Sequence, residues 1–117
     1  MIKSVICERL GIEKPLFQGG MAWIADARLA AAVSNAGGLG LISSILGGPE
    51  AVRAEIRKAK ELTDKPFGVN VMLADPNAAA VADLVVEEGV AVGSVKGAGL
   101  SYEHAFIVAL RVANCSA

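Results

Sequence analysis

Four short apolar runs divide the chain at regular intervals. They are residues 16–18, 39–42, 67–73 and 90–92, and their starts are 23, 28 and 23 residues apart. None of them alternates cleanly between apolar and polar positions, which is typical of parallel strands that are covered on both faces. We expect each run to form one strand of a parallel sheet.

The segments between these runs carry helix signals. Asp26 can cap a helix over residues 27–36, which Gly37 would end. Pro49 suits the first position of a second helix, because the N–H that proline lacks would be unpaired there. Asp75 and Pro76 open a third helix in a similar way. The side chains that share a face are Leu29 and Val33 in the first helix, Val52, Ile56, Ala59 and Leu62 in the second, and Val81, Leu84, Val85 and Glu88 in the third, which stops at Gly89. The charged side chains of the second helix, Arg53, Arg57, Lys60 and Glu61, can face water.

This alternation of strands and helices allows two architectures, an open doubly wound sheet and a closed (β/α)8 barrel. A phosphate-binding loop follows a strand and precedes a helix, whereas the Gly37-Gly38-x-Gly40 cluster follows a helix, so we interpret it as a helix stop. The glycines that follow strands are Gly19, Gly20, Gly97 and Gly99. In either architecture we expect a ligand at these carboxyl ends of the strands.

Charge and cysteine spacing argue against several partners. The net charge is −1, so there is no excess of Lys and Arg to attract nucleic acid or an anionic membrane. Residues 29–48 form an uncharged run long enough to span a bilayer, but glycines interrupt it, and we interpret it as a buried helix followed by a buried strand. Cys7 and Cys115 have no spacing typical of a zinc site or a disulfide framework. A reduced, cytoplasmic setting fits this pattern best.

The chain is unusually apolar for its length. Hydrophobic residues make up 54% of its 117 residues and the mean hydropathy is +0.52, although a small domain has relatively more surface to cover with polar groups. Residues 93–117 hold only three charged side chains, against 20 in residues 1–92. We therefore separate residues 1–92 from a divergent tail, residues 93–117. The composition is typical of the interior of something larger.

Two motifs resemble one enzyme family. They are Phe17-Gln18-Gly19-Gly20-Met21-Ala22-Trp23 and Lys65-Pro66-Phe67-Gly68-Val69-Asn70-Val71-Met72-Leu73. Together they are similar to the FMN-dependent family of nitronate monooxygenase (formerly 2-nitropropane dioxygenase) and enoyl-acyl-carrier-protein reductase II. That family has an α/β fold, the TIM (β/α)8 barrel. The resemblance implies that residues 1–92 are the N-terminal half of such a barrel, incomplete, with about four βα units.

The same resemblance implies which residues lie at the flavin. A Gly-Met-Ala turn would bring its backbone to the flavin ring, and a strand asparagine would add an amide that both donates and accepts hydrogen bonds. A glutamine before the turn is a weaker candidate for the same role, and the loop after the fourth strand, Ser94-Val95-Lys96-Gly97-Ala98-Gly99, matches only loosely. The residues expected at the flavin are Gly20, Met21, Ala22, Asn70, Gln18, Gly97 and Gly99. Trp23 is expected to pack at the rim of the barrel.

FMN is therefore the expected cofactor, with NAD(P)H as a candidate electron donor. The complete enzyme would reduce an enoyl thioester or oxidise a nitronate with oxygen, and its substrate would be a small molecule or an acyl thioester. The catalytic residues stay unassigned, since the only histidine, His104, lies outside the matched region. Two alternatives remain open. One is an inactive half-barrel that self-associates, as a homo-oligomer that completes the barrel, or binds a partner subunit; the other is an independent flavodoxin-like module.

Overall fold

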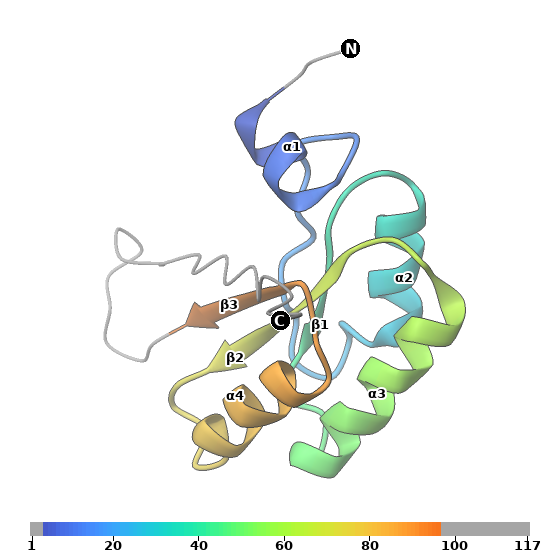
Figure 1. Ribbon diagram of the computed structural model, residues 1–117. Coiled ribbons are helices and arrows are strands. Elements are labelled where there is room, and N and C mark those ends of the chain that lie inside the picture. Colours follow the sequence, from blue (N-terminus) through green and yellow to red (C-terminus); the bar gives the residue numbers. More distant parts are fainter. Residues whose placement is uncertain (1–3, 97–117) are drawn as a thin grey trace.

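The computed structural model describes residues 4–96 (Figure 1). Its centre is a parallel sheet of three strands, β1 (Gly40–Ser43), β2 (Phe67–Met72) and β3 (Val92–Lys96), in the order β1-β2-β3. Four helices accompany it: α1 (Val5–Leu10), α2 (Ala27–Asn35), α3 (Pro49–Leu62) and α4 (Ala78–Glu87). The expected α/β fold with a parallel sheet is confirmed.

The two outer strands differ from the expectation. Residues 16–18 form no strand, and only Phe17 pairs with Leu39, in an isolated parallel bridge. β3 begins at Val92 and not at Val90, because the Val90 N–H donates to the carbonyl of Val85 in the turn that follows α4. β3 then continues to Lys96, across the boundary that we placed after residue 92.

The helix caps explain where the helices begin and end. The Asp26 side chain accepts a hydrogen bond from the Leu29 N–H at the start of α2, as expected. α4 starts later than expected, because Asp75 and Pro76 form a turn in which the Ala78 N–H donates to the Asp75 carbonyl. The short helix α1, which we did not predict, has Ser4 as its N-cap.

The buried face of α2 is not the one that the larger side chains predict. Its buried residues are Ala27, Ala30, Ala31 and Ser34, whereas Leu29 and Val33 are only half-buried. The reason is the close approach of α2 to β1. A Cβ atom on Gly40 would lie 1.9 Å from the Ala30 carbonyl oxygen, so only small side chains fit between this helix and this strand.

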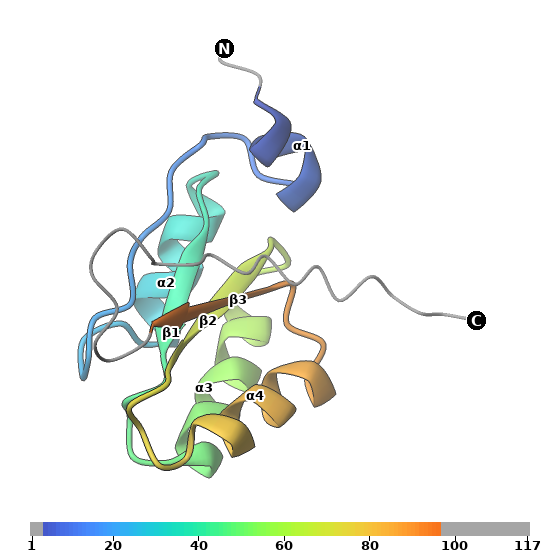
Figure 2. The same ribbon diagram turned by 90° about the vertical axis from the view of Figure 1, so that its left-hand side faces the viewer.

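The three longer helices cover one face of the sheet (Figures 1 and 2). Right-handed crossovers between strands in consecutive order place α2, α3 and α4 on the same side. Ile42, Val69 and Val71 point to that side and pack with the buried residues of α2, α3 and α4. The opposite face has a smaller apolar cluster near the beginning of the strands, where Cys7 and Ile12, which flank the end of α1, pack with Leu39, Leu41 and Val92.

None of the helices within residues 4–96 has the length and apolarity that a bilayer crossing requires. The uncharged run of residues 29–48 folds instead as α2, β1 and their connections, as expected. Cys7 is a buried free thiol, and Cys115 lies outside the described residues. The cytoplasmic location stays a prediction.

Glu88, at the end of α4, holds α4 against α3. Its carboxylate accepts from Arg53 at 2.7 Å and from Arg57 at 3.1 Å, and Lys60 lies 3.4 Å away. Arg53 also pairs with Glu87. We expected the α3 cations to face water, but they neutralise a glutamate on the apolar stripe of α4 that is only 11% exposed. Hydrogen bonds from Arg53 and then Arg57 lower the pKa of Glu88.

This cluster predicts an acid-dependent loss of stability. Because the pKa of Glu88 is lowered in the folded state, its contribution is fully present above the ordinary glutamate value of 4.5 and is lost as the pH falls through the folded-state pKa. Glu88→Gln should reduce stability at neutral pH and flatten its decline in acid. Urea titrations at several pH values measure this, with Glu61→Gln as control, since Glu61 makes no ion pair within residues 4–96. Parallel pH profiles for wild type and Glu88→Gln would contradict the prediction.

Candidate functional site

A row of polar side chains crosses the sheet on the face away from the three longer helices. Ser43 of β1 is in register with Asn70 of β2, and Asn70 is in register with Ser94 of β3. Residues in register share a face, and Asn70 lies between Val69 and Val71, which point to the helices. The three polar residues therefore form one layer on the opposite face, near the carboxyl ends of the strands.

The orientation of the Asn70 amide is set by its neighbours. Ser94 Oγ donates a hydrogen bond of 2.8 Å to Asn70 Oδ1. The Asn70 Nδ2 atom lies against the backbone of Gly20, where an added Cβ would be only 2.6 Å away. Gly20 thus allows a contact between a turn and a strand amide that no larger residue permits without displacing Asn70.

The turn Gly19–Ala22 presents unused hydrogen-bond donors beside this amide. Within the described part of the chain, the N–H groups of Gly20, Met21 and Ala22 have no hydrogen-bond partner. The Met21 carbonyl, in contrast, accepts from the N–H groups of Ile24 and Ala25. Met21 itself is 41% exposed. The turn therefore offers three adjacent N–H donors and an accessible apolar side chain.

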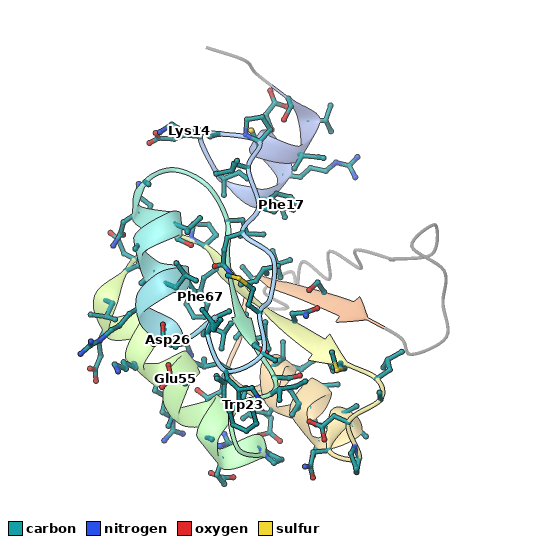
Figure 3. All side chains as sticks on the ribbon, turned by 180° about the vertical axis from the view of Figure 1, so that it is seen from behind. Lys14, Phe17, Trp23, Asp26, Glu55 and Phe67 are labelled. Carbon is teal, nitrogen blue, oxygen red and sulfur yellow. The ribbon has the colours of Figure 1, made fainter. Side chains whose placement is uncertain are left out.

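The rest of this loop is fixed to β1 and α2. The N–H of Ser43 donates to the Ala25 carbonyl at 2.9 Å, and that of Trp23 donates to the Ile45 carbonyl at 3.3 Å. Figure 3 shows Asp26 and Glu55 close together at the start of α2, where Glu55 accepts from the Ala27 N–H at 2.7 Å. These bonds hold the turn on the sheet without using its donors.

Trp23 differs from the packed rim residue that we expected. It has a φ of 65°, uncommon for a bulky residue, and its side chain is 72% exposed. Figure 3 places it at the end of the molecule opposite α1, whereas Phe17 lies beside α1. A bulky residue in this backbone conformation makes the loop a candidate for a functional site.

The structure brings together four of the seven predicted site residues: Gly20, Met21, Ala22 and Asn70. Gln18 lies next to them, but its amide binds the backbone of β1. Gly97 and Gly99 lie outside the described residues. The loop that we matched from Ser94 onward starts later, because residues 94–96 belong to β3.

Ser94 is the site residue that the sequence reasoning missed. We counted it in a degenerate loop, yet it is the hydrogen-bond partner of Asn70. The signal was present in the spacing, because a fourth strand that runs to residue 96 places Ser94 in register with Asn70. The site has no ionisable side chain among Ser43, Asn70, Ser94 and the turn, so its chemistry is neutral hydrogen bonding. Residues 4–96 also hold no cluster of His, Cys, Asp or Glu that could bind a metal.

The family profile described as nitronate monooxygenase matches residues 3–109. The match extends past the boundary that we placed after residue 92 and includes His104, which we expected to lie outside it. The chain belongs to this family. It is 43% identical over 93 residues to (3aS,4S,5R,7aS)-5-hydroxy-7a-methyl-1-oxo-octahydro-1H-indene-4-carboxyl-CoA dehydrogenase from Mycobacterium tuberculosis, a match to 80% of this chain and 26% of that protein. It is 49% identical over 70 residues to nitronate monooxygenase from Pseudomonas aeruginosa, which covers 60% of this chain and 20% of the relative.

Solved structures agree with this assignment. FabK from Thermotoga maritima superposes with a TM-score of 0.80 and 43% identity, over 85% of this chain and 32% of FabK. The chain thus spans about a quarter of the dehydrogenase and a third of FabK. The family is generally FMN-dependent and acts on small-molecule substrates.

Proposed function

We propose that this chain forms the N-terminal segment of an FMN-dependent oxidoreductase barrel, in which it holds the polar edge of the flavin ring. The observation that carries the proposal is the turn Gly19–Ala22, which lies against the Asn70 amide with its donors unused. This pair sits near the carboxyl ends of parallel strands, where (β/α)8 barrels bind their ligands.

The arrangement of the helices supports a barrel segment over a doubly wound sheet. A doubly wound sheet has helices on both faces, whereas α2, α3 and α4 cover one face of strands in consecutive order. The polar layer of Ser43, Asn70 and Ser94 then lies on the face that a barrel turns inward. The superposition on FabK, a TIM-barrel enzyme, is consistent with this.

The residues present fit a flavin ring. A flavin ring alternates donors and acceptors along its polar edge, which suits three N–H groups beside an amide that both donates and accepts. Gly20 permits the close approach of turn and amide, and Met21 supplies an apolar contact for the ring. When bound, FMN would supply hydride transfer from NAD(P)H to an enoyl thioester, or the oxidation of a nitronate by oxygen.

The role of this segment is to bind and orient, not to move protons. Its site has no acid or base, so we place the catalytic groups on the strands that complete the barrel. The phosphate site of a barrel lies after its seventh and eighth strands. We therefore assign the flavin ring to this segment, and the phosphate to strands supplied by a longer chain or by a second copy.

We favour an acyl thioester as the substrate class. The Mycobacterium tuberculosis relative is named as a carboxyl-CoA dehydrogenase, and FabK is an enoyl-ACP reductase II. Each matches at least 80% of this chain, whereas the nitronate monooxygenases of Paraburkholderia phytofirmans and Pseudomonas aeruginosa match 74% and 60%. The reductase therefore stays ahead of the monooxygenase as the proposed activity.

A comparison of FMN with riboflavin tests the proposed division of labour. If this chain contacts the ring and not the phosphate, the fluorescence of both flavins should be quenched on binding. Their two dissociation constants should then agree within about threefold, a difference of less than 1 kcal/mol. Asn70→Ala should weaken both by about 5- to 150-fold, because the half-buried Asn70 amide would no longer pair with the polar edge of the bound flavin. Fluorescence titration, with the oligomeric state measured by light scattering, gives these values.

Asn77→Ala is the matched control, because Asn77 is exposed and its side chain makes no capping hydrogen bond. It should bind both flavins like wild type. Binding of FMN but not riboflavin, equal affinities for Asn70→Ala and wild type, or no quenching by the wild-type chain would each contradict the proposal.

A further inference from the structure

We propose that Gln18 is a positioning residue, whose side chain takes the place of the backbone in the pairing with β1 and so keeps the donors of the flavin-facing turn free. The inference rests on the proposed function for the identity of the ligand. It goes beyond that function by assigning to Gln18 a role that is not contact with the flavin.

The pairing of residues 16–18 with Leu39, the residue before β1, begins with two bonds of a regular parallel ladder. The Leu39 N–H donates to the Leu16 carbonyl at 2.8 Å, and the Gln18 N–H donates to the Leu39 carbonyl at 2.9 Å. In a parallel ladder the next two bonds would run from the Leu41 N–H to the Gln18 carbonyl and from the Gly20 N–H to the Leu41 carbonyl. Neither of these bonds forms in the structure.

The Gln18 side chain makes both connections instead. The Leu41 N–H donates to Gln18 Oε1 at 3.2 Å, and Gln18 Nε2 donates to the Leu41 carbonyl at 3.1 Å. Nε2 also contacts the Gly19 carbonyl, which closes the turn on the same amide. Leu41 is thus fully paired although the strand beside it has ended.

Because the Gln18 side chain makes these bonds, the backbone after Gln18 can leave the sheet. The Gly20 N–H, which a continued ladder would use, has no partner within the described residues, and Gly20 packs against the Asn70 amide. A continued strand would direct this N–H to Leu41 and away from a ligand. The Gln18 side chain therefore keeps Leu41 of β1 paired while the Gly20 N–H of the turn stays free.

On the other side of β1, a side chain also replaces a backbone group in the ladder. The Ser44 N–H donates to the Asn70 carbonyl at 3.0 Å, as a continued ladder requires. The next bond, from the Met72 N–H, goes to Ser44 Oγ at 3.1 Å and not to the Ser44 carbonyl. Side chains thus replace backbone acceptors on both sides of β1 where the strand ends, next to the polar layer.

Glutamine is suited to this role because one neutral group must donate to a carbonyl and accept from an N–H. A carboxylate of the same length can accept from the Leu41 N–H but cannot donate to the Leu41 carbonyl. A protonated carboxyl group can do both. Gln18→Glu should therefore fail when ionised and work when protonated.

The test follows this difference across pH. At about pH 7, Gln18→Glu should bind riboflavin about tenfold or more weakly than wild type, because the Leu41 carbonyl then has no side-chain donor and recruits the Gly20 N–H. At about pH 4, near the ordinary glutamate pKa, the affinity ratio should return toward one. Riboflavin is the probe because it carries no phosphate to titrate. A ratio that does not change with pH would overturn the proposal.

A measurement without flavin separates this inference from the proposed function. In the unliganded chain, amide hydrogen exchange at Gly20 should slow by about fivefold or more in Gln18→Glu at pH 7 and return to the wild-type protection factor at pH 4. Equal Gly20 protection in both proteins would overturn the positioning role. If the exchange pattern holds but wild type does not bind riboflavin, the flavin assignment fails and the role of Gln18 in the ladder stands.

Asn35→Asp is the matched control. The Asn35 amide also donates to a backbone carbonyl, that of Leu62, and accepts from the Thr63 hydroxyl, but it lies at the far end of α2. The same amide-to-acid change should alter stability there and leave both riboflavin affinity and Gly20 exchange at the wild-type value. A pH-dependent loss of riboflavin binding in this control would assign the effect to stability and overturn the proposal.

Discussion

Gly40→Ala should destabilise the protein by about 3 kcal/mol or more, the upper end of the range for overpacked cores. The added Cβ would lie 1.9 Å from the carbonyl oxygen of Ala30 and 2.5 Å from its Cα. All of these atoms are backbone, so no side-chain rotation can relieve the contact. α2 must move away from β1, and the packing of Ala27, Ala30 and Ile42 moves with it.

Gly93→Ala is the control, since Gly93 also lies in a strand but a Cβ there meets nothing within 4 Å. Urea unfolding followed by circular dichroism should give a midpoint near that of wild type for Gly93→Ala and a strongly lowered midpoint for Gly40→Ala. Similar midpoints for the two variants would show that the close contact between α2 and β1 does not limit stability.

Local signals in the sequence predicted the elements where local chemistry decides them. The Asp26 cap, Pro49 at the start of α3 and Gly37 after α2 each act within one helical turn, and all three lie where expected. The apolar runs of residues 39–42 and 67–73 predicted β1 and β2, whereas the run of residues 90–92 overlaps β3 only at Val92. The buried stripe of α3 also held for Val52, Ile56 and Ala59, while Leu62, at the helix end, is 46% exposed.

Features that depend on two segments at once could not be predicted in this way. Which face of α2 is buried depends on the absence of a side chain at Gly40, 10 residues after Ala30. The environment of Glu88 depends on cations of α3 that looked like a solvated face. Residues 16–18 form an apolar run that predicts a strand. Their backbone makes the first two bonds of a parallel ladder with Leu39, and at Leu41 the Gln18 side chain replaces the backbone.

In the candidate site, too, some residues could be predicted from the sequence, whereas others depend on contacts between two segments. The resemblance identified Gly20 and Asn70, and the structure places them in contact. It did not identify Ser94 or the connection between Gln18 and Leu41, because both depend on the register between strands. Residues that contact a ligand can be matched by motif, whereas residues that orient them are found from hydrogen bonds.

Gly20→Ala should abolish most flavin binding while the fold persists. The new Cβ would lie 2.6 Å from Nδ2 and 2.7 Å from Cβ of Asn70. Rotation of the amide could relieve only the contact with Nδ2. The Asn70 Cβ is held by the strand, so the turn must lift off the sheet. This movement removes the pairing of the amide with the free N–H groups, and we expect the affinity for riboflavin to fall by about 10- to 100-fold.

Gly19→Ala separates this contact from a general effect of alanine in the turn. A Cβ on Gly19 meets nothing within 4 Å, so Gly19→Ala should bind riboflavin like wild type. Fluorescence titration and urea unfolding of both variants distinguish lost binding from lost folding. If Gly20→Ala keeps wild-type affinity, the amide of Asn70 does not lie at the flavin; if both variants lose binding equally, the flexibility of the glycine pair matters and not the space at Gly20. The specific result, loss in Gly20→Ala alone, would tie flavin binding to the one place where the turn and the strand amide touch.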